Sequence, residues 1–178
     1  MTRQRFLLLL LFFVSCTQPI KTNPTDIKEF FSQLTPLKLN LSPGTHINSR
    51  PYVIDSIEID LSSIIKLVDA EPFFDPKDIA YFKGQLLADK AGVWQQELFD
   101  SIKIVSQTEL DSIRKFGLHQ DMAPSIRLSK PYFSKDKQYC IQYYNYYCGN
   151  LCSETALKLY KRINGKWTFI KNYFQLVS

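Results

Sequence analysis

The sequence predicts an α+β fold in which N-terminal helices pack on a C-terminal antiparallel β-meander. Near the start of the domain, from Thr25, apolar residues recur at the spacing of an amphipathic helix. From Ser125 onward the chain is instead rich in β-branched and aromatic residues, which favour strands. The dipeptide Asn164-Gly165 lies between the last two of these segments. It indicates a two-residue hairpin turn, because both turn residues must adopt positive φ.

The first two helices are predicted from their caps and their apolar spacing. Thr25 or Asp26 caps the first helix, because a side-chain oxygen there can accept a hydrogen bond from a free backbone N–H. The apolar stripe of this helix consists of Ile27, Phe30, Phe31 and Leu34. Asp75 caps the second helix, and Pro76 occupies its first helical position, where the missing N–H of proline costs no hydrogen bond.

Three short strands and one more helix are predicted around these two helices. Apolar and polar residues alternate in the strands, which cover residues 37–41, 52–61 and 99–106. The third helix is capped by Ser106 or Thr108 and ends at Gly117, a residue type that commonly follows a helix C-terminus.

The meander consists of long strands within residues 125–147, 154–163 and 166–177. The Asn164-Gly165 turn sets the register of the last two strands, because a two-residue loop leaves the flanking residues directly opposite each other. The predicted pairs are Ile163 with Lys166, Tyr160 with Phe169, and Leu159 with Ile170.

The chain opens with "MTRQRFLLLLLFFVSCTQ", in which Arg3 and Arg5 precede nine consecutive apolar residues, 6–14. A helix of this length reaches about 14 Å, less than half of the ~30 Å hydrocarbon core of a bilayer. The run is therefore too short to span a membrane, and it is typical of the apolar region of a secretory signal peptide. It ends where a small residue, Ser15, precedes Cys16.

The Ser15-Cys16 junction resembles the lipobox of bacterial lipoproteins, although Phe13 stands where that family has an aliphatic residue. The resemblance implies that the Cys16 thiol is lipidated and becomes the mature N-terminus, held in the membrane by several acyl chains. The alternative is a plain signal peptide that is cut nearby. The predicted organisation is a signal peptide over 1–15, a lipidated cysteine and tether over 16–24, and a single α+β domain over 25–178.

The N-terminus also predicts a location. An exported protein anchored to the bacterial cell envelope is expected, and no acidic cluster follows Cys16, which favours the periplasmic side of the outer membrane over surface display. The formal net charge of +5 falls to +3 when Arg3 and Arg5 leave with the signal peptide. So small and dispersed a charge argues against nucleic acid as a partner.

Three cysteines and five tyrosines occur in "YCIQYYNYYCGNLCSE", residues 139–154. Zinc would require two ligands beyond Cys148 and Cys152, and nothing in the spacing places Cys140 or a histidine beside them. A redox centre would favour C-x-x-C at a helix N-terminus, whereas this spacing is longer and the flanking segments are strands. No metal and no cofactor are predicted.

A structural disulfide between Cys148 and Cys152 is the favoured interpretation. If the three residues between them form a hairpin loop, the two Cβ atoms lie near the separation that a disulfide needs. The oxidising environment of an exported protein permits the bond. Cys140 would then be a small buried apolar residue. Reduced thiols, or a bond to Cys140, are the alternatives.

Other candidate site residues are few. Alternation along the strand places Tyr144 and Tyr146 on one face, where they could offer a ligand or partner surface, although core packing is the favoured interpretation. His119 and Asp121 could form an acid–base pair just past a helix end. Neither lies in a recognisable nucleophile motif, so no catalytic residue is predicted.

The segments "DPKDIAYFKGQL", "KPYFSKDKQY" and "YYCGNLCSETALKLYKRINGKW" resemble small lipoproteins of Bacteroidetes-type bacteria, over residues 71–178. The resemblance implies the lipid anchor, the architecture and a structural role for the cysteine hairpin, and it adds no catalytic residue. We expect a non-enzymatic, lipid-anchored protein that binds another envelope protein, one version being an immunity-type lipoprotein that neutralises a toxin. The alternative is a hydrolytic or small-ligand-binding domain with a pocket between helices and sheet.

Overall fold

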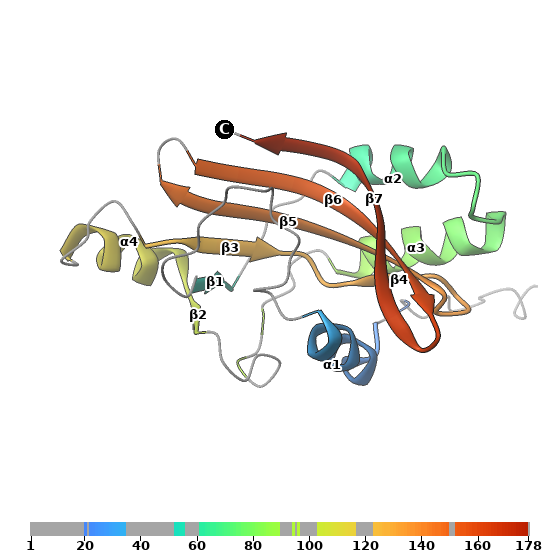
Figure 1. Ribbon diagram of the computed structural model, residues 1–178, viewed down its shortest axis with the longest axis horizontal. Coiled ribbons are helices and arrows are strands. Elements are labelled where there is room, and N and C mark those ends of the chain that lie inside the picture. Colours follow the sequence, from blue (N-terminus) through green and yellow to red (C-terminus); the bar gives the residue numbers. More distant parts are fainter. Residues whose placement is uncertain are drawn as a thin grey trace, which may run out of the picture.

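A computed structural model describes residues 20, 22–34, 52–55, 61–89, 94, 96, 103–116, 123–149 and 152–177. These residues form an α+β fold, as predicted, in which the helices precede the long strands of a mixed sheet (Figure 1). The helices are α1 (Pro24–Gln33), α2 (Leu61–Asp69), α3 (Pro76–Ala88) and α4 (Gln107–Phe116). The strands are β1 (Tyr52–Ile54), β2 (Ile104–Val105), β3 (Ser125–Leu128), β4 (Tyr132–Phe133), β5 (Tyr139–Gly149), β6 (Cys152–Ile163) and β7 (Lys166–Val177).

The sheet has the strand order β2-β1-β3-β5-β6-β7, and β4 also pairs with β5. Strand β1 is parallel to both β2 and β3, whereas β3, β5, β6 and β7 pair with antiparallel neighbours. The antiparallel part of the sheet therefore consists of β3, β4 and the meander of β5, β6 and β7, and β7 lies at the edge (Figure 1).

The helix caps agree with the predictions at α3 and α4 and differ at α1. At α4 the Ser106 hydroxyl accepts a hydrogen bond from the backbone N–H of Glu109 at 3.1 Å. The Asp75 carboxylate accepts hydrogen bonds from the backbone N–H groups of Lys77 and Asp78, both at 2.8 Å, which confirms the cap of α3. Helix α1 begins earlier than predicted, because Asn23 is its cap and Pro24 its first residue. The asparagine side chain accepts from the N–H of Thr25 at 2.9 Å, so the caps predicted at Thr25 and Asp26 are wrong.

Helix α2 was not predicted. The strand expected over 52–61 shrinks to the three residues of β1, and Leu61 begins α2 instead. Ile64 and Val68, four residues apart, are buried at 2% and 0% exposure, which is the spacing of a helix and not of a strand. The strand expected over 37–41 lies outside the described residues.

The β6–β7 hairpin confirms most of the predicted register. Asn164 and Gly165 both have positive φ, 50° and 76°, and Ile163 pairs with Lys166. Tyr160 pairs with Phe169, but Leu159 then pairs with Lys171, because a bulge leaves the next residue of β7 without a partner. A second irregularity follows at Leu157 and Lys158. These two irregularities decide which side chains of β7 lie on each face.

Helices cover the two faces of the meander differently. Phe30 of α1 packs on Tyr160 and Trp167, with ring centroids 5.3 Å and 5.7 Å apart, so α1 covers one end of the first face. Helices α2 and α3 cover the opposite face, through a cluster that includes Phe82 of α3 and Ile141 of β5. Figure 1 shows α1 on one side of the sheet and α2 and α3 on the other. Among the described residues, no helix is both long and apolar enough to cross a membrane.

Candidate functional site

Each face of the meander holds a buried glutamate beside a lysine and a tyrosine. The α1-side group consists of Tyr144, Glu154 and Lys158, which are 0%, 2% and 1% exposed. The α2-side group consists of Glu71, Lys171 and Tyr173, of which Glu71 is 3% exposed. Buried charges cost several kcal/mol each unless they are paired or hydrogen-bonded, so both groups require an explanation.

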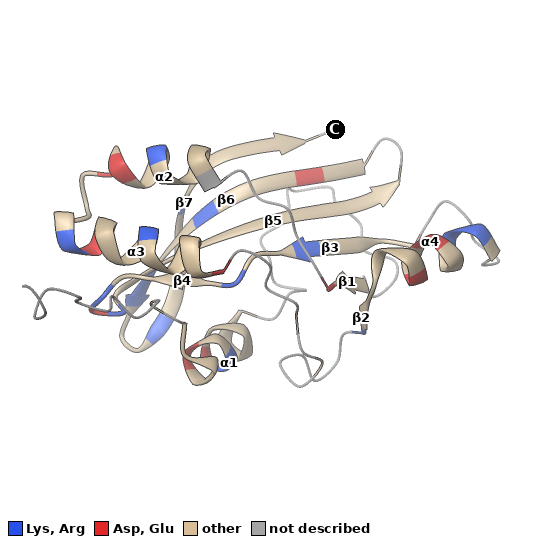
Figure 2. Ribbon diagram, turned by 180° about the vertical axis from the view of Figure 1, so that it is seen from behind, with Lys and Arg blue, Asp and Glu red and all other residues tan. Residues whose placement is uncertain are grey.

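The α1-side group is built by the pairing of β5 with β6. Tyr144 lies directly opposite Ala156, so Glu154 and Lys158 flank the tyrosine on the same face of the sheet. The Tyr144 hydroxyl donates a hydrogen bond to Oε1 of Glu154. Nζ of Lys158 lies 4.5 Å from the centroid of the Tyr144 ring and 5.5 Å from that of Phe169. Tyr144 therefore links the acidic and the basic position of β6, both visible along that strand in Figure 2.

Hydrogen bonds connect this group to the surface at the sheet edge. Nε2 of Gln175 donates to Oε1 of Glu154 at 2.9 Å, and Nδ2 of Asn172 donates to Oε1 of Gln175 at 2.7 Å. Gln175 is exposed, whereas Tyr144 at the other end is fully buried. The network thus runs from solvent at β7 to the interior at β5.

A row of three polar side chains crosses the same face beside this network. Lys158 of β6 is the register partner of both Gln142 of β5 and Asn172 of β7. We call Gln142, Lys158 and Asn172 the polar row. Nε2 of Gln142 and Oδ1 of Asn172 are buried and have no hydrogen-bond partner. Leaving such an atom unsatisfied costs about 1–3 kcal/mol, so the row holds one unused donor and one unused acceptor on either side of a lysine.

The charges of the α1-side group are shifted by their surroundings. Burial raises the pKa of Tyr144, and the hydrogen bond to Glu154 raises it further. Burial lowers the pKa of Lys158, whereas the charge of Glu154 opposes that shift. Burial thus favours the neutral form of both side chains. Groups perturbed by burial together with a specific charged neighbour are common at functional sites.

The α2-side group has a different geometry. Nζ of Lys171 lies 2.6 Å from Oε2 of Glu71, forming a direct ion pair. The same nitrogen lies 4.9 Å from the Tyr173 ring centroid and 5.6 Å from that of Phe73. Burial raises the pKa of Tyr173, and the neighbouring Glu71 carboxylate raises it further. Because Glu71 follows α2 in the chain, this ion pair holds the α2–α3 connection onto β7, which is a structural role.

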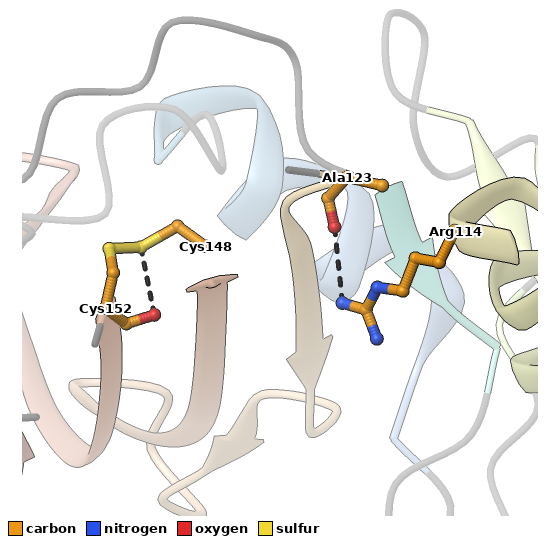
Figure 3. Close-up of a disulfide and its surroundings, with 4 residues drawn as sticks. All are labelled: Arg114, Ala123, Cys148 and Cys152. Atoms are coloured by element: carbon orange, nitrogen blue, oxygen red, sulfur yellow. Dashed lines mark hydrogen bonds between the residues drawn. A yellow bond between two sulfur atoms is a disulfide. The ribbon is translucent and has the colours of Figure 1, made fainter. Parts of the chain in front are cut away.

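The predicted disulfide between Cys148 and Cys152 is present, with the two Cα atoms 5.1 Å apart (Figure 3). It joins the end of β5 to the start of β6. Nearby, the Arg114 guanidinium of α4 donates to the Ala123 carbonyl oxygen at 3.2 Å and stacks 4.7 Å from the Tyr147 ring centroid. Both contacts stabilise this end of the sheet.

Cys140 is a buried free cysteine, and burial raises the pKa of its thiol well above the usual value. The thiolate is the reactive form of cysteine, and a raised pKa keeps Cys140 in the thiol form. Cys140 therefore contributes to packing in the core.

The structure describes two of the predicted ligand-surface residues, and both are buried. Tyr144 and Tyr146 are 0% and 1% exposed, so they form no exposed surface for a ligand or partner, because the core packs on the face they occupy. Tyr144 nevertheless belongs to the polar group described above. Cys16, His119 and Asp121 lie outside the described residues.

Glu154 and Lys158 were missed as site residues. Their positions two residues before and after Ala156 indicate that both side chains lie on the same face of a strand. The register with β5 is needed to show that this is the face that carries Tyr144.

No group of three or more His, Cys, Asp or Glu side chains that could hold a metal occurs within the described part of the chain. The α1-side group and the polar row can instead offer hydrogen bonds and a charge to a polar molecule. Comparisons with protein-family models, with curated proteins and with solved structures found no match to this chain.

Proposed function

We propose that the chain is an exported, lipid-anchored protein of the cell envelope, and that its domain is a non-enzymatic binding module for a small polar ligand. One observation carries the binding part of this proposal: the buried, unpartnered Nε2 of Gln142 and Oδ1 of Asn172 lie on either side of Lys158. A bound molecule would satisfy both atoms at once. The anchoring part is supported by the apolar run over 6–14 and by the Ser15-Cys16 junction, and the periplasmic side of the outer membrane is the proposed location.

The contrast between the two faces supports a binding role for the polar row. Where the fold uses a buried glutamate for structure, it places a lysine within 2.6 Å of the carboxylate. On the other face, Glu154 receives its described hydrogen bonds from Tyr144 and Gln175, and the unpartnered atoms belong to two amides beside a lysine. The unpartnered atoms of the α2 side, Oε1 of Glu71 and the hydroxyl of Tyr173, instead belong to the ion-paired group itself.

The test is recovery of a ligand from protein made in a bacterial host that processes lipoproteins. The full chain is purified from membranes in detergent and denatured, and the released small molecules are identified by mass spectrometry. A stoichiometric molecule is expected from the native chain and from Asn145→Leu, a control on β5 outside the polar row. It should be lost from the double variant Gln142→Leu, Asn172→Leu. Equal recovery from all three proteins, or from none, would contradict the proposal.

Lipidation has its own readout. Cys16→Ser is expected to move the protein from the membrane fraction to the soluble exported fraction and to remove the mass of the acyl chains. An unchanged distribution between the fractions would contradict the anchor.

A second candidate function is binding of another envelope protein, including a toxin in the immunity-type version. It is favoured by the apolar side chains exposed on β7, since Ile170, Leu176 and Val177 are 39%, 67% and 62% exposed. Cross-linking of the tagged protein in membranes of its own host, read by mass spectrometry, tests this candidate. A reproducible one-to-one partner that is lost from Leu176→Ser would establish it.

A further inference from the structure

The polar row restricts the chemistry of the molecule that could fill it. We infer that its ligand carries a carboxylate together with a separate N–H donor, as a free amino acid or a short peptide does. This inference rests on the proposed binding function and names the ligand class for the same site. It follows from the spacing, the charge and the hydrogen-bond direction of Gln142, Lys158 and Asn172.

The spacing of the row suits a short molecule lying across β6. Neighbouring strands are about 4.8 Å apart, so the backbones of Gln142 and Asn172 are separated by about 10 Å, with Lys158 midway. All three side chains lie on the same face, because register partners on neighbouring strands point the same way. The spacing therefore sets the length of the ligand: a molecule of a few heavy atoms spans the distance between the two amides.

A negative group is favoured on the β5 side of the row. Nε2 of Gln142 is an N–H donor, and the ammonium of Lys158 is the nearest cation in the row. Burial disfavours the charged form of Lys158, whereas the carboxylate of Glu154 and the faces of Tyr144 and Phe169, with ring centroids 4.5 Å and 5.5 Å from Nζ, favour positive charge on that ammonium. A carboxylate presents two oxygens and one negative charge, so it complements a neutral donor placed beside a cation.

A donor is required on the β7 side. Asn172 already uses Nδ2 to donate to Oε1 of Gln175 at 2.7 Å, and this bond fixes the orientation of the amide. The atom left over is therefore Oδ1, which can only accept. A ligand ammonium or amide N–H satisfies it, whereas a second carboxylate would be repelled. The ligand would enter from this edge of the sheet, where Gln175 is exposed.

The experiment is calorimetric titration of the detergent-solubilised, lipidated chain, first depleted of ligand by unfolding and refolding. The probes are a panel of proteinogenic amino acids and glycylglycine, with acetate and ethylamine as molecules that carry only one of the two groups, and ribose as a neutral polyol. At least one amino acid or glycylglycine should bind at least about tenfold more tightly than acetate or ethylamine, a difference of about 1.4 kcal/mol.

Variants assign the contacts. Gln142→Leu and Asn172→Leu should each weaken the binding by about tenfold or more, while Asn145→Leu leaves it unchanged. Both row variants are expected to fold, because each removes one unsatisfied buried atom, and the hydrogen bond to Gln175 that Asn172→Leu also removes lies at the exposed edge of the sheet. Circular dichroism and thermal unfolding of each variant confirm the fold before titration.

The outcomes separate this inference from the function on which it rests. If acetate binds as tightly as the best amino acid, or if ribose binds and the amino acids do not, the ligand class is wrong while a ligand site remains. The ligand class is also wrong if the molecule released from native protein lacks a carboxylate or an N–H group. If no probe binds and no molecule is released, the two unpartnered atoms hold only water, and both proposals fail. Binding that survives Gln142→Leu and Asn172→Leu would place the ligand elsewhere.

Discussion

The two Glu–Lys–Tyr groups contain the same three residue types, but their side chains contact one another in different ways. On the α2 side, Lys171 bonds Glu71 directly and the tyrosine hydroxyl lacks a partner. On the α1 side, Tyr144 bonds the glutamate instead, and Lys158 lies over the tyrosine ring. The side-chain types alone therefore do not specify the role of such a group.

The two groups differ because one lysine is partly exposed to solvent and the other is buried. The Lys171 side chain is 41% exposed, so its ammonium keeps contact with water while it pairs with a buried carboxylate. Lys158 is 1% exposed and lies between aromatic rings, at the centre of a row whose outer members each have an unused atom. The first arrangement stabilises a loop on a strand. The second keeps polar groups in the interior at a cost to stability, as binding sites commonly do.

The largest effect is expected from Glu154→Ala. This change removes the acceptor of Tyr144 and Gln175 and the carboxylate nearest to buried Lys158 on β6. We expect the free energy of unfolding to fall by about 3–5 kcal/mol, the usual cost of removing one partner from a buried charged group. Urea unfolding followed by circular dichroism measures it, and Glu154→Gln, which keeps the shape and one acceptor, should cost less.

A smaller loss is expected from Glu71→Ala, about 1–3 kcal/mol. Here the freed Lys171 ammonium can turn to water, since its side chain is 41% exposed, so no buried charge is left without a partner. The same urea series measures this value. A loss larger than that of Glu154→Ala would overturn the distinction that we propose between the two groups.

Alkaline pH should affect both groups through their tyrosines. The pKa values of Tyr144 and Tyr173 are raised above the usual 10.0, so the folded state holds these protons more tightly than the unfolded chain. Their contribution is fully present below pH 10 and is lost as the pH rises above it, by about 1.4 kcal/mol per pH unit for each proton.

Thermal unfolding between pH 8 and pH 12 tests this linkage, together with tyrosine absorbance. Tyr144→Phe and Tyr173→Phe should each flatten the fall in stability with pH. Ionisation of all the tyrosines before the sheet unfolds would show that burial does not hold these protons.

The smallest change in stability is expected from Lys158→Met, within about 1 kcal/mol of the native chain at pH 7. Glu154 keeps its hydrogen bonds from Tyr144 and Gln175, and methionine packs well against aromatic rings. The pKa of Lys158 is lowered below the usual 10.5, so the unfolded chain binds more protons between the two values, and the native chain gains stability as pH rises through that window. Lys158→Met should lack this gain, whereas a loss of several kcal/mol at pH 7 would give Lys158 a structural role.

Local patterns predicted the elements that local chemistry controls. The Asp75-Pro76 start of α3, the Asn164-Gly165 turn and the disulfide between Cys148 and Cys152 each depend on residues a few positions apart. Residue pairs far from a turn were predicted less well, because their register is counted along the strand and a bulge shifts it. Leu159 pairs with Lys171 because β7 contains a bulge, and no residue type in β7 predicts that bulge.

The sequence by itself determined the α+β class, the apolar segment and Ser15-Cys16 junction at the N-terminus, and the hairpins of the meander, because caps, turns and periodicity act over short distances. Only the tertiary structure decided which polar residues meet. Gln142, Lys158 and Asn172 come from three strands, and their row exists because pairing and a bulge bring them to one face. The same pairing placed Glu154 beside Tyr144, whereas Lys171 on the opposite face met Glu71 from far along the chain. Burial is a property of the assembled sheet, so the charges it perturbs become visible only there.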